Sequence, residues 1–123
     1  IMFELTIKGT VYPFNLGIGF VREINKTVKV EMSGVKEDAG LTMAMTHLYD
    51  GSVIALVDIL DFANKGREPR VSKQDLEDYI EDPDTDIEKL FDDVIGFFTK
   101  SNATRKQATK LFATLAVTES TEA

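Results

Sequence analysis

Three aspartates near the middle of the stretch YIEDPDTDIEKLFDDVIGFF, residues 79–98, have the spacing of metal ligands. Asp82, Asp84 and Asp86 match positions one, three and five of a calcium-binding loop. That loop also needs glycine at position six, where Ile87 stands, and a bidentate glutamate at position twelve, where an aspartate stands. We therefore interpret these carboxylates as groups that cap a helix and complement its dipole, and we expect no bound metal.

Other candidates for catalytic chemistry are few. Asp58 and Asp61 lie three residues apart in an otherwise apolar helical segment, residues 53–64, and so share a face. Two such carboxylates form either an acid–base pair or the solvent-facing edge of a helix, and the edge is the favoured interpretation. His47 is the only histidine, and cysteine is absent. The sequence therefore indicates neither an enzyme nor a cofactor.

The charge of the chain is unevenly placed. The net charge is −7, yet residues 75–93 hold ten carboxylates against one lysine, whereas residues 100–110 hold four basic residues and no acid. An acidic chain is a poor non-specific ligand for nucleic acid. The sequence also lacks an apolar run of about 18 residues, so we expect no membrane span.

The pattern of apolar residues predicts an α+β domain that is mostly a bundle of about five helices behind an N-terminal β-hairpin. Residues 3–8 alternate between apolar and polar side chains, and residues 11–14 form the second strand. Residues 28–32 are expected to be extended. Helical segments are predicted at residues 17–26, 36–49, 53–64, 72–80, from a cap at Asp84 or Asp86 to about residue 100, and from 102 or 104 onward. Residues 2–116 form the single domain, and residues 117–123 are expected to be a disordered tail.

Some apolar side chains exceed what a small core is expected to bury. Phe97 and Phe98 are adjacent, so one narrow helix face does not bury both, and Met43 lies off the apolar stripe of its helix. Methionine suits adaptable binding surfaces because it is flexible and polarizable. The predicted partner-binding residues are therefore Met43, Met45, Phe97 and Phe98.

Several ordered segments carry a resemblance to a known family. They are FELTIKGTVYPFNLGIGFVREINK, HLYDGSVIALVDILDFANKG, PRVSKQDLEDYIED and DTDIEKLFDDVIGFF. Together they resemble the tail assembly chaperones of long-tailed bacteriophages (siphoviruses) that infect Gram-positive bacteria, over about residues 2–112. None of these segments is a catalytic motif.

The resemblance implies a non-catalytic protein of the infected host's cytoplasm that is absent from the mature virion. It implies two partners: the tape measure protein, which the chaperone coats and keeps soluble, and the major tail protein, whose tube subunits it helps to recruit. An alternative function of another class is an acidic inhibitor that mimics nucleic acid and occupies a basic site on a host enzyme.

The two charged segments also suggest self-association. Asp82, Asp84 and Asp86 of one copy are predicted to meet Arg105, Lys106 and Lys110 of another. Such a head-to-tail contact produces a homo-oligomer in the form of a ring or an open spiral.

Overall fold

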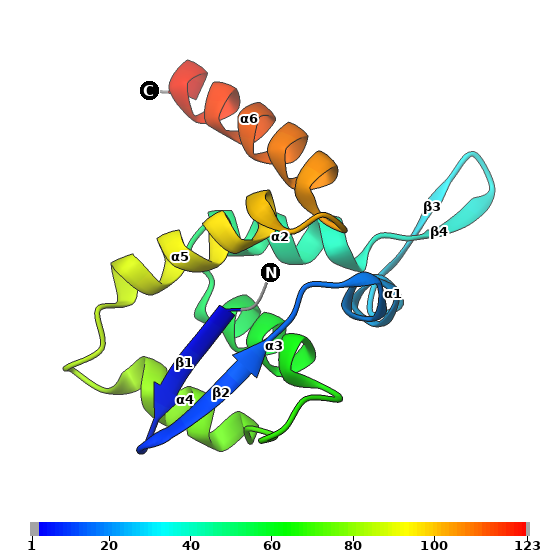
Figure 1. Cartoon of the computed structure of the whole chain (residues 1–123). Helices are drawn as coiled ribbons and strands as arrows, with labels where there is room; N and C mark the ends of the chain where they lie inside the picture. Colours follow the sequence, from blue (N-terminus) through cyan, green and yellow to red (C-terminus); the bar gives the residue numbers. More distant parts are fainter. Residues whose placement is uncertain (1–2, 123) are drawn as a thin grey trace.

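The computed structural model describes the backbone of residues 3–122, which contain six helices and two β-hairpins (Figure 1). The predicted α+β class, with an N-terminal hairpin against a helical bundle, is confirmed. The elements are β1 (Phe3–Ile7), β2 (Thr10–Phe14), α1 (Ile18–Asn25), β3 (Lys29–Met32), β4 (Val35–Asp38), α2 (Gly40–Tyr49), α3 (Val53–Asn64), α4 (Lys73–Glu81), α5 (Ile87–Lys100) and α6 (Arg105–Glu122).

The first hairpin covers α3 and α4. β1 and β2 pair antiparallel from Phe3 opposite Phe14 to Ile7 opposite Thr10. Lys8 and Gly9 form the two-residue turn, both with positive φ, as a tight hairpin requires. Phe14 and Ile7 are buried, and the chain then turns into α1. This hairpin therefore closes one side of the core, as the alternating pattern predicted.

Three helices begin where the sequence predicted, because each has a side-chain cap. Ser52 Oγ accepts a hydrogen bond from Ala55 N at the start of α3. Ser72 Oγ and Asp86 Oδ1 do the same for α4 and α5. Each cap satisfies a backbone N–H that has no partner within its helix.

The packing of α5 corrects the prediction that Phe97 and Phe98 are not both buried. Phe97 stacks on Phe3 of the first hairpin, with ring centroids 5.3 Å apart. Phe98 contacts Phe20 of α1 at 6.0 Å. Both rings are buried because α5 has a neighbour on each of these two sides. Met45 of α2 is also fully buried.

The second hairpin, which we call the β-arm (residues 29–38), was only half predicted. Residues 28–32 are extended as expected, but residues 36–38 pair with them instead of beginning a helix. Ser33 and Gly34 make the turn with φ of 54° and 79°. Glu31 lies opposite Lys36, and Lys29 donates to Asp38, so cross-strand charge pairs favour the strand over the helix.

The last helix is longer than predicted. α6 continues through residues 117–122, which the sequence predicted to be disordered, and residue 123 lies outside the described residues. Tyr49 of α2 stacks on Phe112 at 5.9 Å, which holds the first half of α6 against the bundle. Within residues 3–122 no helix combines the length and apolar character needed to cross a membrane.

Candidate partner-binding surface

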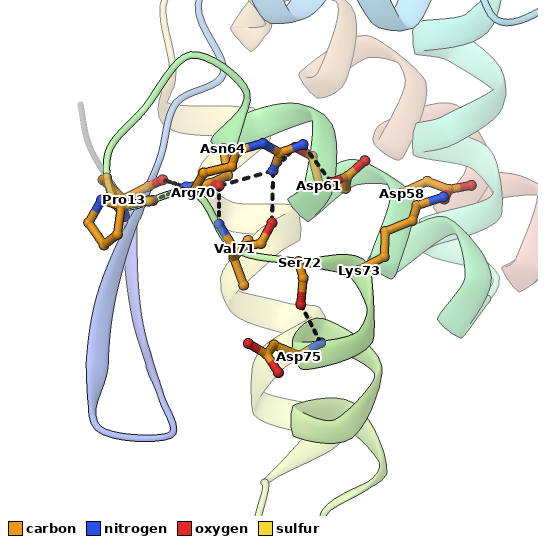
Figure 2. Close-up of polar contacts among 10 residues, drawn as sticks. Pro13, Asp58, Asp61, Asn64, Arg70, Val71, Ser72, Lys73 and Asp75 are labelled. Carbon is orange, nitrogen blue, oxygen red and sulfur yellow. Dashed lines mark hydrogen bonds and ion pairs between the residues drawn. The ribbon is translucent and has the colours of Figure 1, made fainter.

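The two carboxylates considered for acid–base chemistry are each held by a cation of their own. Asp58 accepts from Lys73 at 3.0 Å and Asp61 from Arg70 at 2.8 Å (Figure 2). The hydrogen bond with Asp58 raises the pKa of the Lys73 ammonium group. Asp61 is also buried, so the solvent-edge interpretation is wrong for this residue. Both pairs tie α3 to the segment that leads into α4.

A buried asparagine completes this link, and sequence reasoning missed it. Asn64 ends α3 and is fully buried. Its Nδ2 donates to the carbonyls of Pro13 and Pro69 at 2.9 and 3.1 Å. Its Oδ1 accepts from Val71 N and Arg70 Nη1 at 2.7 and 3.0 Å (Figure 2). One side chain thus joins the first hairpin, α3 and the loop before α4, a role that no local sequence signal marks.

The acidic stretch does not form a metal site in the part of the chain that is described. Asp86, and not Asp84, caps α5, and Asp82 Oδ1 accepts from Asp84 N in the preceding turn. Among the side chains that the structure describes, those of residues 3–120, no group of three or more acidic or histidine side chains is arranged to hold a metal ion. These aspartates therefore shape the α4–α5 turn and present charge to solvent.

Two acids at the beginning of the same stretch have a different role. Asp75 and Asp78 both accept from Lys8, at 2.8 and 2.9 Å. These hydrogen bonds raise the pKa of Lys8. The bond from Lys8, and then that from Gln74, lowers the pKa of Asp78. The turn of the first hairpin is thereby tied to α4.

An apolar surface remains on α3 after these contacts are made. Ile54 is 74% exposed and Val53 is 47% exposed, although both belong to a helix whose opposite side fills the core. Their neighbours Leu56, Ile59 and Leu60 are buried. A helix that is apolar nearly all round needs cover on every side, and the described residues leave this side open.

Ile54 forms a ridge between two grooves. The α3–α4 groove has a volume of about 310 Å³, is lined by Val53, Ile54, Val57 and Ile80, and carries Asp58, Lys73, Glu77 and Glu81 along its rim. The α2–α3 groove, of about 190 Å³, lies on the other side, and its lining includes Val28, Met43, Ala44 and Ile54. We call the ridge and both grooves the α3 surface.

The α3 surface contains one of the four residues predicted to bind a partner. Met43 is half-buried and lines the α2–α3 groove. Met45, Phe97 and Phe98 lie in the core, so none of them is presented to a partner in this conformation. The sequence signal for the α3 surface is the apolar helix itself, whose exposed side the sequence did not identify.

The β-arm extends the apolar lining beyond the α2–α3 groove. Val28 lines that groove and immediately precedes β3. Val30 and Met32 follow at two-residue spacing, so they lie on the same side of the strand, and Val35 faces Met32 across the arm. Met32 and Val35 are exposed near the turn. One face of the arm therefore carries these three apolar side chains together with Glu37, and the other face is charged.

A comparison with protein-family models matches residues 4–112 to the phage tail assembly chaperone proteins, abbreviated TAC. The chain belongs to this family. No curated protein and no solved structure matches the chain. The matched residues include the first hairpin apart from Phe3, the second hairpin, the whole α3 surface and α6 as far as Phe112.

Family membership confirms the resemblance inferred from the sequence at the level of the tail assembly chaperone. It favours that function over the alternative of a nucleic-acid-mimicking inhibitor. A chaperone of phage tail assembly acts inside the infected bacterial cell, where tails are built. The functional surface of such a chaperone is one that binds other proteins, and the α3 surface has the chemistry for this.

Proposed function

We propose that this chaperone binds apolar helical segments of the tape measure protein at the α3 surface and keeps that protein soluble during tail assembly. The observation that carries the proposal is the exposure of Ile54, 74%, on a ridge between two apolar grooves. Covering a side chain of this size is worth roughly 2 kcal/mol, so the bare surface favours association.

The form of the grooves favours an amphipathic helix as the occupant. Helix-in-groove recognition places apolar side chains spaced three and four residues apart into a hydrophobic groove. Ile54 separates two such grooves, so a bound helix lies along the ridge or beside it. Glu77 and Glu81 are exposed along the α3–α4 groove. The segment that fits best therefore has an apolar stripe flanked by lysine or arginine.

The remaining steps of the proposal follow the family resemblance. The chaperone acts for a long-tailed phage of a Gram-positive host, helps to recruit major tail protein subunits, and is displaced as the tube forms. Several copies coat one tape measure protein and contact each other. A binding surface of a few apolar side chains suits this role, because each copy is held weakly enough to be displaced.

Co-expression tests the proposal. The tape measure protein of the same genome is expressed alone, with the wild-type chaperone, and with the Ile54→Glu variant. We expect the wild type to raise the soluble fraction of the tape measure protein severalfold and to co-purify with it. Ile54→Glu loses both effects, since a charge replaces the apolar ridge on an exposed position and leaves the core intact.

A matched control separates the loss of a specific binding site from a general effect of the added charge. Val11→Glu introduces the same charge at another exposed apolar position, on β2 and outside the α3 surface. Circular dichroism checks that both variants are folded. If Ile54→Glu solubilises the tape measure protein as well as Val11→Glu does, the α3 surface is not the binding site.

A further inference from the structure

We infer that a basic pocket at the end of α3 binds a carboxylate of the segment that lies along the α2–α3 groove, so that the chain selects an apolar helix with an acidic end. This inference rests on the proposed function and deepens it, because it names the charge and the direction of the bound segment. Its test uses synthetic peptides and requires no tape measure protein.

The basic pocket lies between α1 and the loop that follows α3. It has a volume of about 390 Å³, and its lining includes Arg22 of α1 together with Lys65 and Arg67 after α3. All three residues are exposed. None of them forms an ion pair with a carboxylate in the part of the chain that the structure describes. Three cations therefore surround one hollow without an internal counter-charge.

One carboxylate also lines the pocket, but it has a partner outside the three bases. Glu23 Oε1 lies 3.6 Å from Lys26 Nζ. Lys65 is positioned by a contact of its own, with its Nζ 3.9 Å from the centroid of the Phe62 ring. The face of an aromatic ring attracts an ammonium group but accepts none of its hydrogen bonds in the way a carboxylate does. The pocket thus keeps its positive charge and its donors.

The basic pocket continues the α2–α3 groove. Phe62 lines both hollows. Ile54, Asp58 and Phe62 all line the groove and follow one another at four-residue spacing, so they lie on one face of α3. The carboxylate of Asp58 is paired with Lys73 at 3.0 Å. The groove and the pocket therefore form a single track along α3, which is largely apolar where the helix begins and basic beyond its end.

The neighbouring helices hold this track in shape. α1 and α2 both pack against α3 (Figure 1). Arg22 is carried by α1, and the wall of the groove opposite α3 belongs to α2. The bases and the apolar lining are thus placed on elements of one packed core, so a ligand meets a preformed surface and loses less free energy to ordering.

The occupant that fits this track is a helix whose apolar stripe is followed by aspartate or glutamate. Guanidinium groups bind carboxylates through charge-assisted hydrogen bonds that are often bidentate, and the pocket contains two arginines. Ile18, 68% exposed, lines the same pocket and offers apolar surface to the stem of the incoming side chain. The combination of charge and apolar surface makes the contact more specific than charge alone.

The acidic end and the basic flank of the bound segment occupy different places. Lysine or arginine is expected beside Glu77 and Glu81 of the α3–α4 groove, on the flank of the segment. The carboxylate is expected beyond the end of the apolar stripe. A stripe alone fits a groove in either direction, because its three- and four-residue spacing is the same from both ends. An acidic end at the basic pocket therefore gives the segment one direction along α3.

Phosphate and nucleic acid are less suitable occupants of the basic pocket. The whole chain carries a net charge of −7, so a polyanion is repelled by most of its surface. Glu23 also lies in the wall of the pocket and repels a doubly charged phosphate more strongly than a single carboxylate. Charge complementarity together with the adjoining apolar groove therefore favours an acidic peptide segment.

Fluorescence anisotropy with labelled peptides tests the inference on the full chain. The peptides have about 18 residues, a leucine stripe at helical spacing and blocked ends, and they differ only in a final Glu-Glu, Gln-Gln or Lys-Lys pair. At low salt we expect the wild type to bind the Glu-Glu peptide about fivefold more tightly than the Gln-Gln peptide, and the Lys-Lys peptide about fivefold more weakly. Both differences shrink as salt is raised.

A pocket-reversed variant, Arg22→Glu with Arg67→Glu, provides the decisive arm. It changes exposed side chains and leaves the α2–α3 groove intact, so we expect it to prefer the Lys-Lys peptide. The control, Lys89→Glu with Lys100→Glu, changes the net charge equally at exposed positions on α5 and keeps the wild-type order. Equal binding of the three peptides by the wild type, no binding of any of them, or the same order in the pocket-reversed variant overturns the inference.

A phosphate buffer distinguishes the two possible sources of negative charge. At matched ionic strength, replacing chloride by inorganic phosphate is expected to leave the preference for the Glu-Glu peptide unchanged. Loss of that preference in phosphate would assign the pocket to phosphate and overturn the inference.

The outcome is separable from that of the proposed function. If the tape measure protein is solubilised through Ile54 but the wild type binds the three peptides equally, the basic pocket alone is wrong. If the peptides are discriminated as described but the tape measure protein stays insoluble, the proposed function is wrong and the specificity of the track stands.

Discussion

Asn64 is the residue on which the arrangement around α3 depends most. Its side chain satisfies two carbonyls and a buried backbone N–H from two segments, the first hairpin and the loop before α4. It also orients Arg70, which in turn holds Asp61. A buried polar network of this kind favours a single arrangement of the core only when each of its polar groups has a hydrogen-bond partner. The position of the α3 surface relative to the first hairpin therefore follows from one amide group.

The variant Asn64→Ala tests this dependence. It leaves the Val71 N–H and the Pro13 and Pro69 carbonyls without their partner. We expect a loss of about 3 kcal/mol in the free energy of unfolding, measured by denaturant titration, because each buried unsatisfied group costs about 1–3 kcal/mol. The exposed Asn102→Ala serves as the control and changes stability by less than about 0.5 kcal/mol. Equal stabilities of the two variants would refute the role of Asn64.

The link between Lys8 and α4 makes a prediction about pH. The pKa of Asp78 is lowered from 3.8 by the bond from Lys8, so its contribution to stability is present above pH 3.8 and is lost as the pH falls through the lowered value. The pKa of Lys8 is raised from 10.5, so its contribution is lost only as the pH rises through that raised value. The link therefore contributes fully to stability between pH 3.8 and pH 10.5.

Replacing Lys8 by methionine reports on this link directly. In an NMR titration of the side-chain carboxyl, Lys8→Met is expected to move the midpoint of Asp78 upward, toward its ordinary value. Lys36→Met removes a charge from the β-arm instead and is expected to leave the midpoint unchanged. An Asp78 midpoint that is the same in wild type and Lys8→Met would show that the contact is absent in solution.

At the scale of the elements, the close approach of α1 and α2 sets the base of the β-arm. A Cβ on Gly40 would lie 1.8 Å from the carbonyl oxygen of Ile24 and 2.6 Å from Thr27 Oγ1. Leu41 N donates to Asn25 Oδ1, and Ala39 N donates to the carbonyl of Val28. The arm therefore projects from a tightly joined base.

Gly40→Ala is expected to force these helices apart and to destabilise the protein by about 3 kcal/mol, at the upper end of overpacking effects. Gly19→Ala is the matched control, since a Cβ at Gly19 meets nothing within 4 Å. Gly19 lies in α1, and alanine loses less conformational entropy in a helix than glycine does. Gly19→Ala is therefore expected to raise the free energy of unfolding by up to about 1 kcal/mol. Thermal unfolding of both variants measures the contrast, and a Gly40→Ala variant as stable as Gly19→Ala would contradict the packing described.

The elements that the sequence predicted well are those with local signals. Ser52 and Ser72 mark the starts of α3 and α4, and the alternation in residues 3–8 marks β1. β4 was missed because its residues, VKED, have no apolar alternation, and its pairing partner and the Ser33–Gly34 turn decide its structure. The length of α6 was missed because a polar segment gives no signal of where a helix ends.

The candidate site was less predictable than the fold. That α3 needs cover on all sides follows from its sequence, but which side stays open depends on how α1, α2, α4 and β2 pack against it. Phe97 and Phe98 were assigned to the surface because their separate partners, Phe3 and Phe20, lie far away in the sequence. The same cause, long-range packing, hid the exposure of Ile54.

At the scale of the whole molecule, the apolar and the charged surfaces lie apart. The α3 surface is apolar, whereas the acidic α4–α5 turn and the basic start of α6 lie at the two ends of α5. In the proposed function, the α3 surface is the one that contacts the tape measure protein.

Site-specific photo-crosslinking tests the central claim most directly. A photoreactive amino acid replaces Ile54 in one variant and the exposed Val11 in another, and each variant is co-expressed with the tape measure protein and irradiated. The α3 surface predicts an abundant crosslink to the tape measure protein from position 54 and little or none from position 11. Equal crosslinking from both positions, or none from position 54 in a complex that co-purifies, would contradict it.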